Sequence, residues 1–284
     1  MKRNLFLNPH IIKKNILFGL GILCLVIYVS QVYAQSDSIR LIRKIALQAS
    51  SVEADFQGHI YVVTRQNELL KLNDTGGIMR RYSNNYLGTL QLISIHNPLQ
   101  IVLFYPGFQT LIILDNSLNE LKRIAMTQLN IPYVTTLGYS PEREIWYFDE
   151  PLKRFKKVNI NGRHILESSL ENKYQPERVH KIMIQKNEVK VWCDTSMLIT
   201  MDLNGNMKEQ VYQAGDWIYW KEQLTGFFHQ QRVIIRDSDH PLPQILRGFP
   251  EGLPVMAGLS IMDGGYAAID QEGVLYFLRF GPEP

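Results

Sequence analysis

Cysteine is almost absent from this sequence, which has two in 284 residues, Cys24 and Cys193. Cys24 lies in an N-terminal segment with the features of a cleaved signal, so one thiol would remain in the mature chain. A single cysteine excludes an internal disulfide and a zinc site built on cysteine pairs. Cys193 sits in an apolar, strand-like stretch without an activating neighbour. The sequence therefore predicts a buried structural thiol rather than a nucleophile.

A hydrophobic run at the N-terminus is shorter than a membrane span. Residues 16–29 form an apolar run of 14 residues, whereas a spanning helix needs about 20. Basic residues precede it, and the small-residue cleavage signature Val32-Tyr33-Ala34 follows. This layout predicts a secretory signal peptide over residues 1–34, cleaved near Ala34, and no retained membrane span. The alternative is an uncleaved anchor. We expect a periplasmic protein, with the extracellular medium as the alternative.

A surplus of basic residues is also missing once the leader is removed. The formal charge of the whole chain is 30 − 27 = +3, and residues 1–34 carry four basic and no acidic residues. The mature chain then has 26 − 27 = −1. Nucleic-acid binding requires Lys and Arg to displace counterions, so we expect no nucleic-acid partner. The remaining composition, 45% hydrophobic with 19 Gly and 13 Pro, is that of a globular protein rather than a disordered one.

The motifs of several enzyme classes do not occur either. The chain has no Gly-Xaa-Ser-Xaa-Gly elbow and no phosphate-binding loop, and its histidines lack the i, i+4 spacing of a helical zinc motif. Serine-hydrolase, nucleotide and zinc-hydrolase chemistry therefore lack their usual residues. We assign no catalytic residue and no metal ligand from the sequence.

The mature chain instead repeats one plan six times. Each unit has an apolar strand ending in a polar residue, a polar turn, a second apolar strand, and a turn rich in Asn, Asp or Gly. A further strand precedes each pair, and an amphipathic strand follows it. A period near 40 with four strands per unit predicts an all-β six-bladed β-propeller with four-stranded antiparallel blades. The equivalent positions are Leu72, Leu114, Val158, Met201, Ile235 and Leu278, which are 42, 44, 43, 34 and 43 residues apart.

The two ends of the chain predict how the ring closes. The sixth unit ends after three strands, and an unassigned strand, residues 39–47, precedes the first unit. Its residues 41–47 are similar to residues 121–126, the fourth strand of the second unit. We therefore expect the N-terminal strand to complete the last blade and leave no open sheet edge. Residues 35–284 would form one propeller domain; a β-sandwich or two small β domains is the alternative.

This repeat form resembles that of secreted six-bladed β-propellers of the NHL and TolB-like kind, over nearly all of residues 36–281. The Trp-Asp dipeptides of WD repeats, the kelch double glycines and the sialidase Asp-box are absent. The size and the predicted signal are also similar to those of periplasmic propellers that accompany outer-membrane secretion translocons in Bacteroidota. The resemblance implies an envelope protein whose rigid ring presents one face to a partner.

Candidate site residues follow from the geometry of antiparallel blades. The loops between second and third strands emerge on one face, where propellers usually bind ligands. The alternative for the acidic candidates is that they are ordinary turn formers. The alternative for the two tryptophan candidates is that their rings are packed between blades and do not anchor an interface. The candidates at strand ends are Arg65, Tyr105, Asp149, Asp194, His229 and Asp270, with Trp217 and Trp220 as the aromatic pair.

Two functions from different classes fit these features. The first is a non-enzymatic binding or assembly protein of the cell envelope, with a protein, peptide or glycan partner and no cofactor. The alternative is a lactonase-like hydrolase with calcium held by Asp149, Asp194 and Asp270, and with His229 as a proton shuttle.

Overall fold

The computed structural model describes residues 38–281, apart from His96, Pro98, Thr195, Glu251 and residues 169–175, 222–223, 230–231 and 238–239. The chain divides into two units, and Ile39–Arg279 holds the sheets. Of the other unit, only Ser38, Phe280 and Gly281 are described. The predicted signal peptide lies outside these residues. In the part of the chain that is described, no helix is long and apolar enough to cross a membrane.

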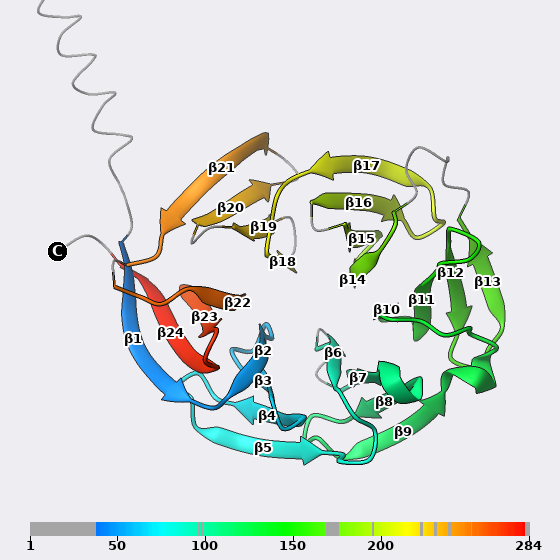
Figure 1. Ribbon diagram of the computed structural model, residues 1–284, viewed down its shortest axis with the longest axis horizontal. Helices are drawn as coiled ribbons and strands as arrows, with labels where there is room; N and C mark the ends of the chain where they lie inside the picture. Colours follow the sequence, from blue (N-terminus) through cyan, green and yellow to red (C-terminus); the bar gives the residue numbers. More distant parts are fainter. Residues whose placement is uncertain are drawn as a thin grey trace, which may run out of the picture. The chain divides into compact units, whose positions relative to one another are not determined.

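Six four-stranded antiparallel sheets form a β-propeller, as the repeat predicts. The first strands of the blades lie at the centre of the ring and the fourth strands at its rim (Figure 1). Blades 1 to 3 follow one another along the chain. Blade 1 contains β2 (Ala49–Ala54), β3 (Ile60–Thr64), β4 (Glu68–Leu72) and β5 (Ile78–Ser83); blade 2 contains β6 (Gln91–Ser94), β7 (Ile101–Tyr105), β8 (Thr110–Leu114) and β9 (Glu120–Ala125); blade 3 contains β10 (Leu137–Tyr139), β11 (Glu144–Asp149), β12 (Arg154–Asn159) and β13 (His164–Glu167).

Blades 4 to 6 complete the ring. Two short 3-10 helices, η1 (Pro106–Phe108) and η2 (Met126–Leu129), lie in loops of blade 2. Blade 4 contains β14 (Val179–Gln185), β15 (Glu188–Cys193), β16 (Met197–Asp202) and β17 (Met207–Tyr212); blade 5 contains β18 (Trp217–Lys221), β19 (Leu224–His229), β20 (Arg232–Asp237) and β21 (His240–Gly248); blade 6 contains β22 (Met256–Met262), β23 (Gly265–Asp270), β24 (Val274–Gly281) and β1 (Ser38–Ala46).

The burial of each strand follows its position in the blade. The middle strands β3, β7 and β8 are buried at every position, because neighbouring blades cover both of their faces. Short, continuous runs of apolar residues are typical of such strands. The outer strand β5 is exposed at five of its six positions. Hydrophobic clusters fill the spaces between blades, for example Trp146 and Phe155 of blade 3 against Val191 of blade 4.

One turn recurs in at least five blades and explains the Asn, Asp and Gly signal of the repeat. The side chain of its first residue accepts hydrogen bonds from the backbone N–H groups two and four residues later, which fixes a five-residue turn. The fourth residue has a positive φ, and glycine adopts it without a Cβ penalty. The exception is Leu118 (φ 63°), which is buried. The first residues of these turns are Asp55, Asn73, Asp115, Asn159, Asp202 and Asp270.

The N-terminal strand closes the ring as predicted. Strand β1 pairs with β24, so the last sheet has the order β1-β24-β23-β22. Ile39 is buried, and Ile45 packs against the cluster between blades 6 and 1. Arg43 Nη1 also donates to Thr75 O of blade 1 at 2.7 Å. The first strand of the domain therefore holds the final sheet and its neighbour together.

Buried lysines connect adjacent blades. Lys71 Nζ donates to Asn116 O of the next blade at 3.2 Å and lies 5.6 Å from the centre of the Tyr61 ring. Lys157 makes the equivalent contact with Leu203 O at 3.1 Å. Burial lowers the pKa of Lys71. Because each ammonium has a carbonyl acceptor in the next blade, these lysines fix the spacing between blades.

Candidate functional site

The loops after the second strands, together with the crossovers between blades, form one face of the propeller, here called the loop face. All six strand-end candidates lie at this face. They are one strand further from the axis than the first strands that line the channel, so none of them contacts the central cavity. The positions are Arg65 after β3, Tyr105 ending β7, Asp149 ending β11, Asp194 after β15, His229 ending β19 and Asp270 ending β23.

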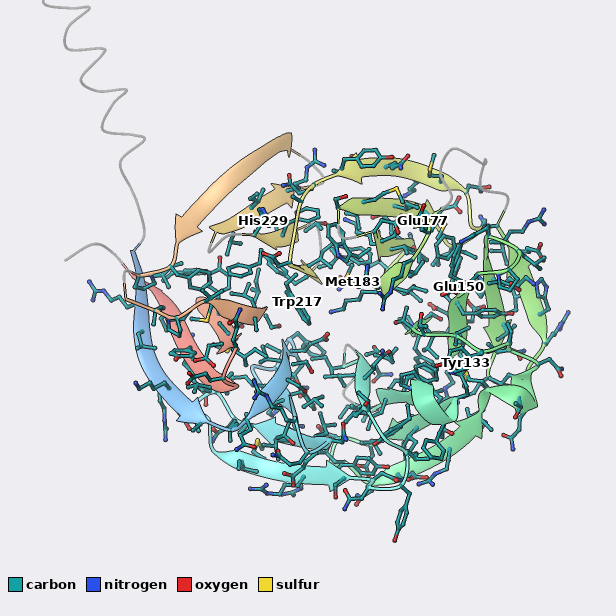
Figure 2. The ribbon with its side chains drawn as sticks, viewed as in Figure 1. Tyr133, Glu150, Glu177, Met183, Trp217 and His229 are labelled. Atoms are coloured by element: carbon teal, nitrogen blue, oxygen red, sulfur yellow. The ribbon has the colours of Figure 1, made fainter. Side chains whose placement is uncertain are left out.

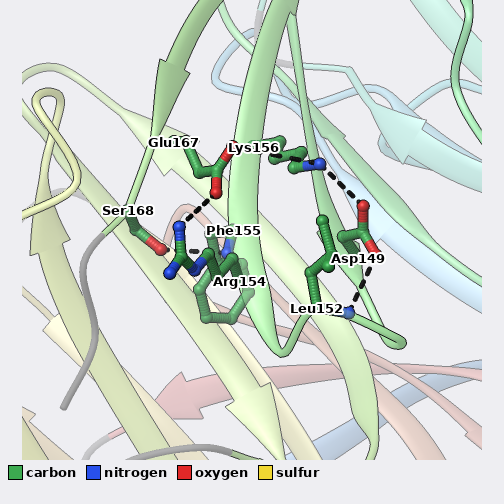
Figure 3. Close-up of polar contacts among 7 residues, drawn as sticks. All are labelled: Asp149, Leu152, Arg154, Phe155, Lys156, Glu167 and Ser168. Atoms are coloured by element: carbon green, nitrogen blue, oxygen red, sulfur yellow. Dashed lines mark hydrogen bonds and ion pairs between the residues drawn. The ribbon is translucent and has the colours of Figure 1, made fainter.

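Asp149 is engaged within its own blade. Its Oδ1 accepts the backbone N–H of Leu152 at 3.1 Å, and its Oδ2 pairs with Lys156 Nζ at 2.8 Å (Figure 3). The hydrogen bond to Asp149 raises the pKa of Lys156. The same blade carries the pair Arg154–Glu167 on its outer strands. The Asp149 carboxylate therefore shapes the loop that follows β11.

Asp270 and Asp194 are also occupied by local hydrogen bonds. Asp270 Oδ1 accepts from the backbone of Glu272 and Val274, and its Oδ2 accepts the Tyr276 hydroxyl at 2.8 Å. Asp194, at φ 49°, accepts the backbone N–H of Arg178 at 2.8 Å. These contacts are those of turn and loop formers.

The other strand-end candidates differ in their surroundings. His229 Nδ1 lies 3.3 Å from Asp216 Oδ2 of its own blade. Arg65 donates to Gln271 O of blade 6 and ties blade 1 to it. Tyr105 is fully buried, and burial raises the pKa of its hydroxyl. The geometry does not bring these side chains together into one site.

The acidic candidates do not form a cation site. Across the described residues, no group of three or more His, Cys, Asp or Glu side chains is arranged to hold a metal ion. Asp149, Asp194 and Asp270 come from different blades, and each is engaged by nearby groups. The calcium alternative therefore gains no support from the arrangement of these carboxylates.

Calcium should leave the stability of the protein unchanged. A metal bound in the channel mouth at a hundred times its dissociation constant would add about 2.7 kcal/mol of unfolding free energy. For a domain of this size, that amounts to a rise in Tm of about 5 to 10 °C. We expect thermal melts with calcium and with chelator to coincide. A chelator-sensitive rise of several degrees, abolished by Asp270→Asn, would contradict this expectation.

Cys193 is buried, as its sequence context predicts. Burial raises the pKa of its thiol, and its Sγ lies 3.6 Å from Val191 O. The thiolate is the reactive form of cysteine. A thiol held protonated inside a blade is therefore a packing group.

Both tryptophan candidates line the central cavity, but they differ in burial. Trp220 is 7% exposed and packs with Met183, Trp192 and Phe227 between blades 4 and 5. Trp217 is partly exposed and lies near the axis of the ring, as Figure 2 shows. Trp217 lines the central cavity, and its Nε1 donates to Leu259 O of blade 6 at 2.8 Å.

The central cavity has a volume of about 320 Å³ and is crossed by an ion pair. Glu53 of blade 1 and Lys181 of blade 4 lie on opposite sides of the ring, and their Oε1 and Nζ atoms are 2.8 Å apart. Lys181 Nζ also lies 5.0 Å from the centre of the Trp217 ring. Because the two charges neutralise each other, this pair acts as a tie across the axis and offers no free charge to a ligand.

Two long stretches of the sequence contain no charged residue, a feature that a search for charged candidate residues does not detect. The 33 residues between Arg81 and Asp115 contain no Asp, Glu, Lys or Arg, and neither do the 18 residues between Arg123 and Glu142. In a chain that is 20% charged, about ten charged residues would be expected over these lengths. Three loops of the loop face lie within these stretches: residues 84–90, 106–109 and 126–136.

These three loops meet on the loop face and expose aromatic rings. Strand register places them at the same end of blade 2, because Gln91 lies opposite Phe104 and Thr110 lies opposite Ala125. A Cβ on Gly88 would lie 3.9 Å from Phe108 Cε2. We call the exposed rings of these loops the neutral patch; they are Tyr86 (88% exposed), Phe108 (59%) and Tyr133 (69%).

Comparisons with known proteins show the fold and nothing finer. No protein-family description and no curated protein matches the sequence. Among solved structures, the Cps50 (Swd1) β-propeller domain of Myceliophteria thermophila is 8% identical with a TM-score of 0.62, covering 85% of this chain and 99% of that one. Streptogramin B lyase is 10% identical with a TM-score of 0.57, covering 87% and 100%.

A third solved structure comes from a bacterial surface. PorZ of Porphyromonas gingivalis, an essential surface component of the type-IX secretion system, is 12% identical with a TM-score of 0.54. The likeness covers 83% of this chain and 32% of PorZ. Identities this low show the propeller fold alone.

Proposed function

We propose that this protein is an exported, non-enzymatic binding or assembly propeller of the bacterial cell envelope, which holds a protein partner on its loop face. The neutral patch is the observation that carries this proposal. Protein interfaces are enriched in Tyr and Phe and depleted of charged residues at their core. Tyr86, Phe108 and Tyr133 reproduce that composition on one surface.

The loops that carry the patch are held in place before any partner binds. Leu87 and Leu90 insert into the core between blades 1 and 2. Ile131 and Val134 do the same between blades 2 and 3. Because these loops are already ordered, binding would cost little conformational entropy. A rigid surface of exposed rings suits stable recognition of a partner.

The location in the envelope rests on separate support. The predicted signal peptide, residues 1–34, would export the chain, and a periplasmic location follows from it. PorZ shares the propeller fold and belongs to a secretion system. We therefore favour an accessory role beside an outer-membrane secretion translocon. The alternative, a calcium-dependent lactonase, has no comparable observation in its favour.

Recovery of a stoichiometric complex tests this function. The full chain, tagged at its C-terminus and expressed in its native host, is crosslinked mildly in intact cells and purified from the envelope fraction. We expect one dominant protein to co-elute with it in a fixed ratio on size exclusion. Tagging the recovered protein should return the propeller.

A matched variant serves as the control for this experiment. Leu121 is 59% exposed on the outer strand β9, away from the loop face. Leu121→Ser should leave the complex intact. A propeller that elutes alone from every cell fraction would contradict the proposed function.

A further inference from the structure

Four amide side chains at the neutral patch are bonded to the loops themselves. Side-chain amides of Asn and Gln can both donate and accept hydrogen bonds, and so can bind polar ligands. Here Gln109, Gln91 and Asn67 fasten one loop to another, and Asn84 bonds within its own loop. Asn85, Gln128 and Asn130 of the same loops are exposed. Gln109 accepts from the backbone N–H of Val134 at 3.0 Å and donates to its carbonyl at 2.8 Å, Gln91 donates to Thr135 O at 3.2 Å, Asn84 accepts from Tyr86 N at 3.2 Å, and Asn67 accepts from Leu90 N at 3.3 Å.

The neutral patch offers a partner exposed aromatic rings. Its three loops contain no Asp, Glu, Lys or Arg. The neighbouring loop of blade 3 marks its limit, because Glu150 and Lys153 lie there. An ionic partner would find no complementary charge within the patch. Apolar side chains can be buried against the rings without leaving an unpaired charge.

We infer that the neutral patch docks an uncharged, apolar segment of the partner protein. This inference rests on the proposed function and names the chemistry of its contact. Aromatic anchors on preordered loops carry much of the energy of a protein interface. Salt therefore does not weaken binding through this patch, since no charge is screened. Phe108 and Tyr133 act as the anchors, because their loops are joined through Gln109 and Val134.

Selection from a peptide library tests this inference without the native partner. A display library of random dodecapeptides is panned on the immobilised mature chain, and selected peptides are measured in solution. We expect enriched sequences that lack charge and contain aromatic or aliphatic residues. Their affinity should not fall between low salt and about 1 M NaCl. The double variant Phe108→Ser, Tyr133→Ser should weaken binding about tenfold or more, while Leu121→Ser should not.

Several results would overturn the inference. These are enriched peptides that carry charges and lose affinity at high salt, peptides that bind the double variant as well as the wild type, or a selection that yields no patch-dependent peptide. Patch-dependent binding of neutral oligosaccharides such as maltohexaose would overturn it in favour of a glycan. Both substituted rings are exposed, so the double variant should keep the wild-type melting temperature, which confirms that it is folded.

Failure of this inference is distinct from failure of the proposed function. If a stoichiometric partner is recovered from the envelope but selected peptides are charged, the function stands and the inference fails. If neutral peptides bind the patch but no partner is recovered, the chemistry of the patch stands and the proposed function fails.

Discussion

A chain that begins at Leu47, and so lacks β1, is expected to lose about 3 to 5 kcal/mol of unfolding free energy, because the buried apolar surface of Ile39 and Ile45 is lost. Strand β24 would then present an open edge, which is an aggregation hazard. For a domain of this size, the loss corresponds to a fall in Tm of about 10 °C. Thermal melting of the two chains measures it.

The contribution of β1 can be separated from a general effect of truncation. Ile42 is 62% exposed, so Ile42→Ala in the full chain should melt like the wild type. A synthetic peptide of residues 38–46 added to the truncated chain should restore part of the lost Tm by adding the missing strand. If the truncated chain melts with the full chain, the closure described here does not hold the ring together.

Gly226→Ala is expected to destabilise the protein by crowding an aromatic ring between two blades. Gly226 is buried in β19 and lies opposite Tyr219 of β18. A Cβ at this position would lie 1.9 Å from the Tyr219 ring, so the ring must leave its place between the blades. Overpacking of this kind costs about 1 to 3 kcal/mol or more. Chemical denaturation should show the loss as a lower midpoint.

Two companion variants identify the cause of that loss. A Cβ on Gly107 would meet no atom within 4 Å, so Gly107→Ala should change the stability by less than about 0.5 kcal/mol. In a Tyr219→Ala background the clash is absent, and Gly226→Ala should then cost far less than it does in the wild type. Equal costs in the two backgrounds would show that the ring is not the obstacle.

The architecture could be predicted because its signals are local and repeated. The strand register confirms the alignment of the six units: Leu72 lies opposite Ile60, Leu114 opposite Ile101, and Leu278 opposite Tyr266. The Asn, Asp and Gly residues of the turns act within five residues of chain. The closure of the ring could also be predicted, because the last repeat lacks one strand and the N-terminal strand belongs to no other repeat.

The arrangement of side chains between blades could not be predicted in the same way. Glu53 and Lys181 are 128 residues apart and meet only because their blades face each other across the ring. An aspartate that forms a turn has the same sequence context as one that binds a ligand, and the contacts of Asp149 and Asp270 fit the turn role. The neutral stretches around Tyr86, Phe108 and Tyr133 were visible in the sequence, but as an absence of charge.

Photo-crosslinking in living cells shows whether the neutral patch holds a protein partner. A benzoylphenylalanine placed at Phe108 of the full chain samples the neutral patch, and one placed at Leu121 samples the outer surface of the same blade. We expect a discrete protein adduct from position 108, with its crosslink in an uncharged segment of the partner, and no such adduct from position 121. An adduct from position 121 alone, or the same adducts from both positions, would contradict it.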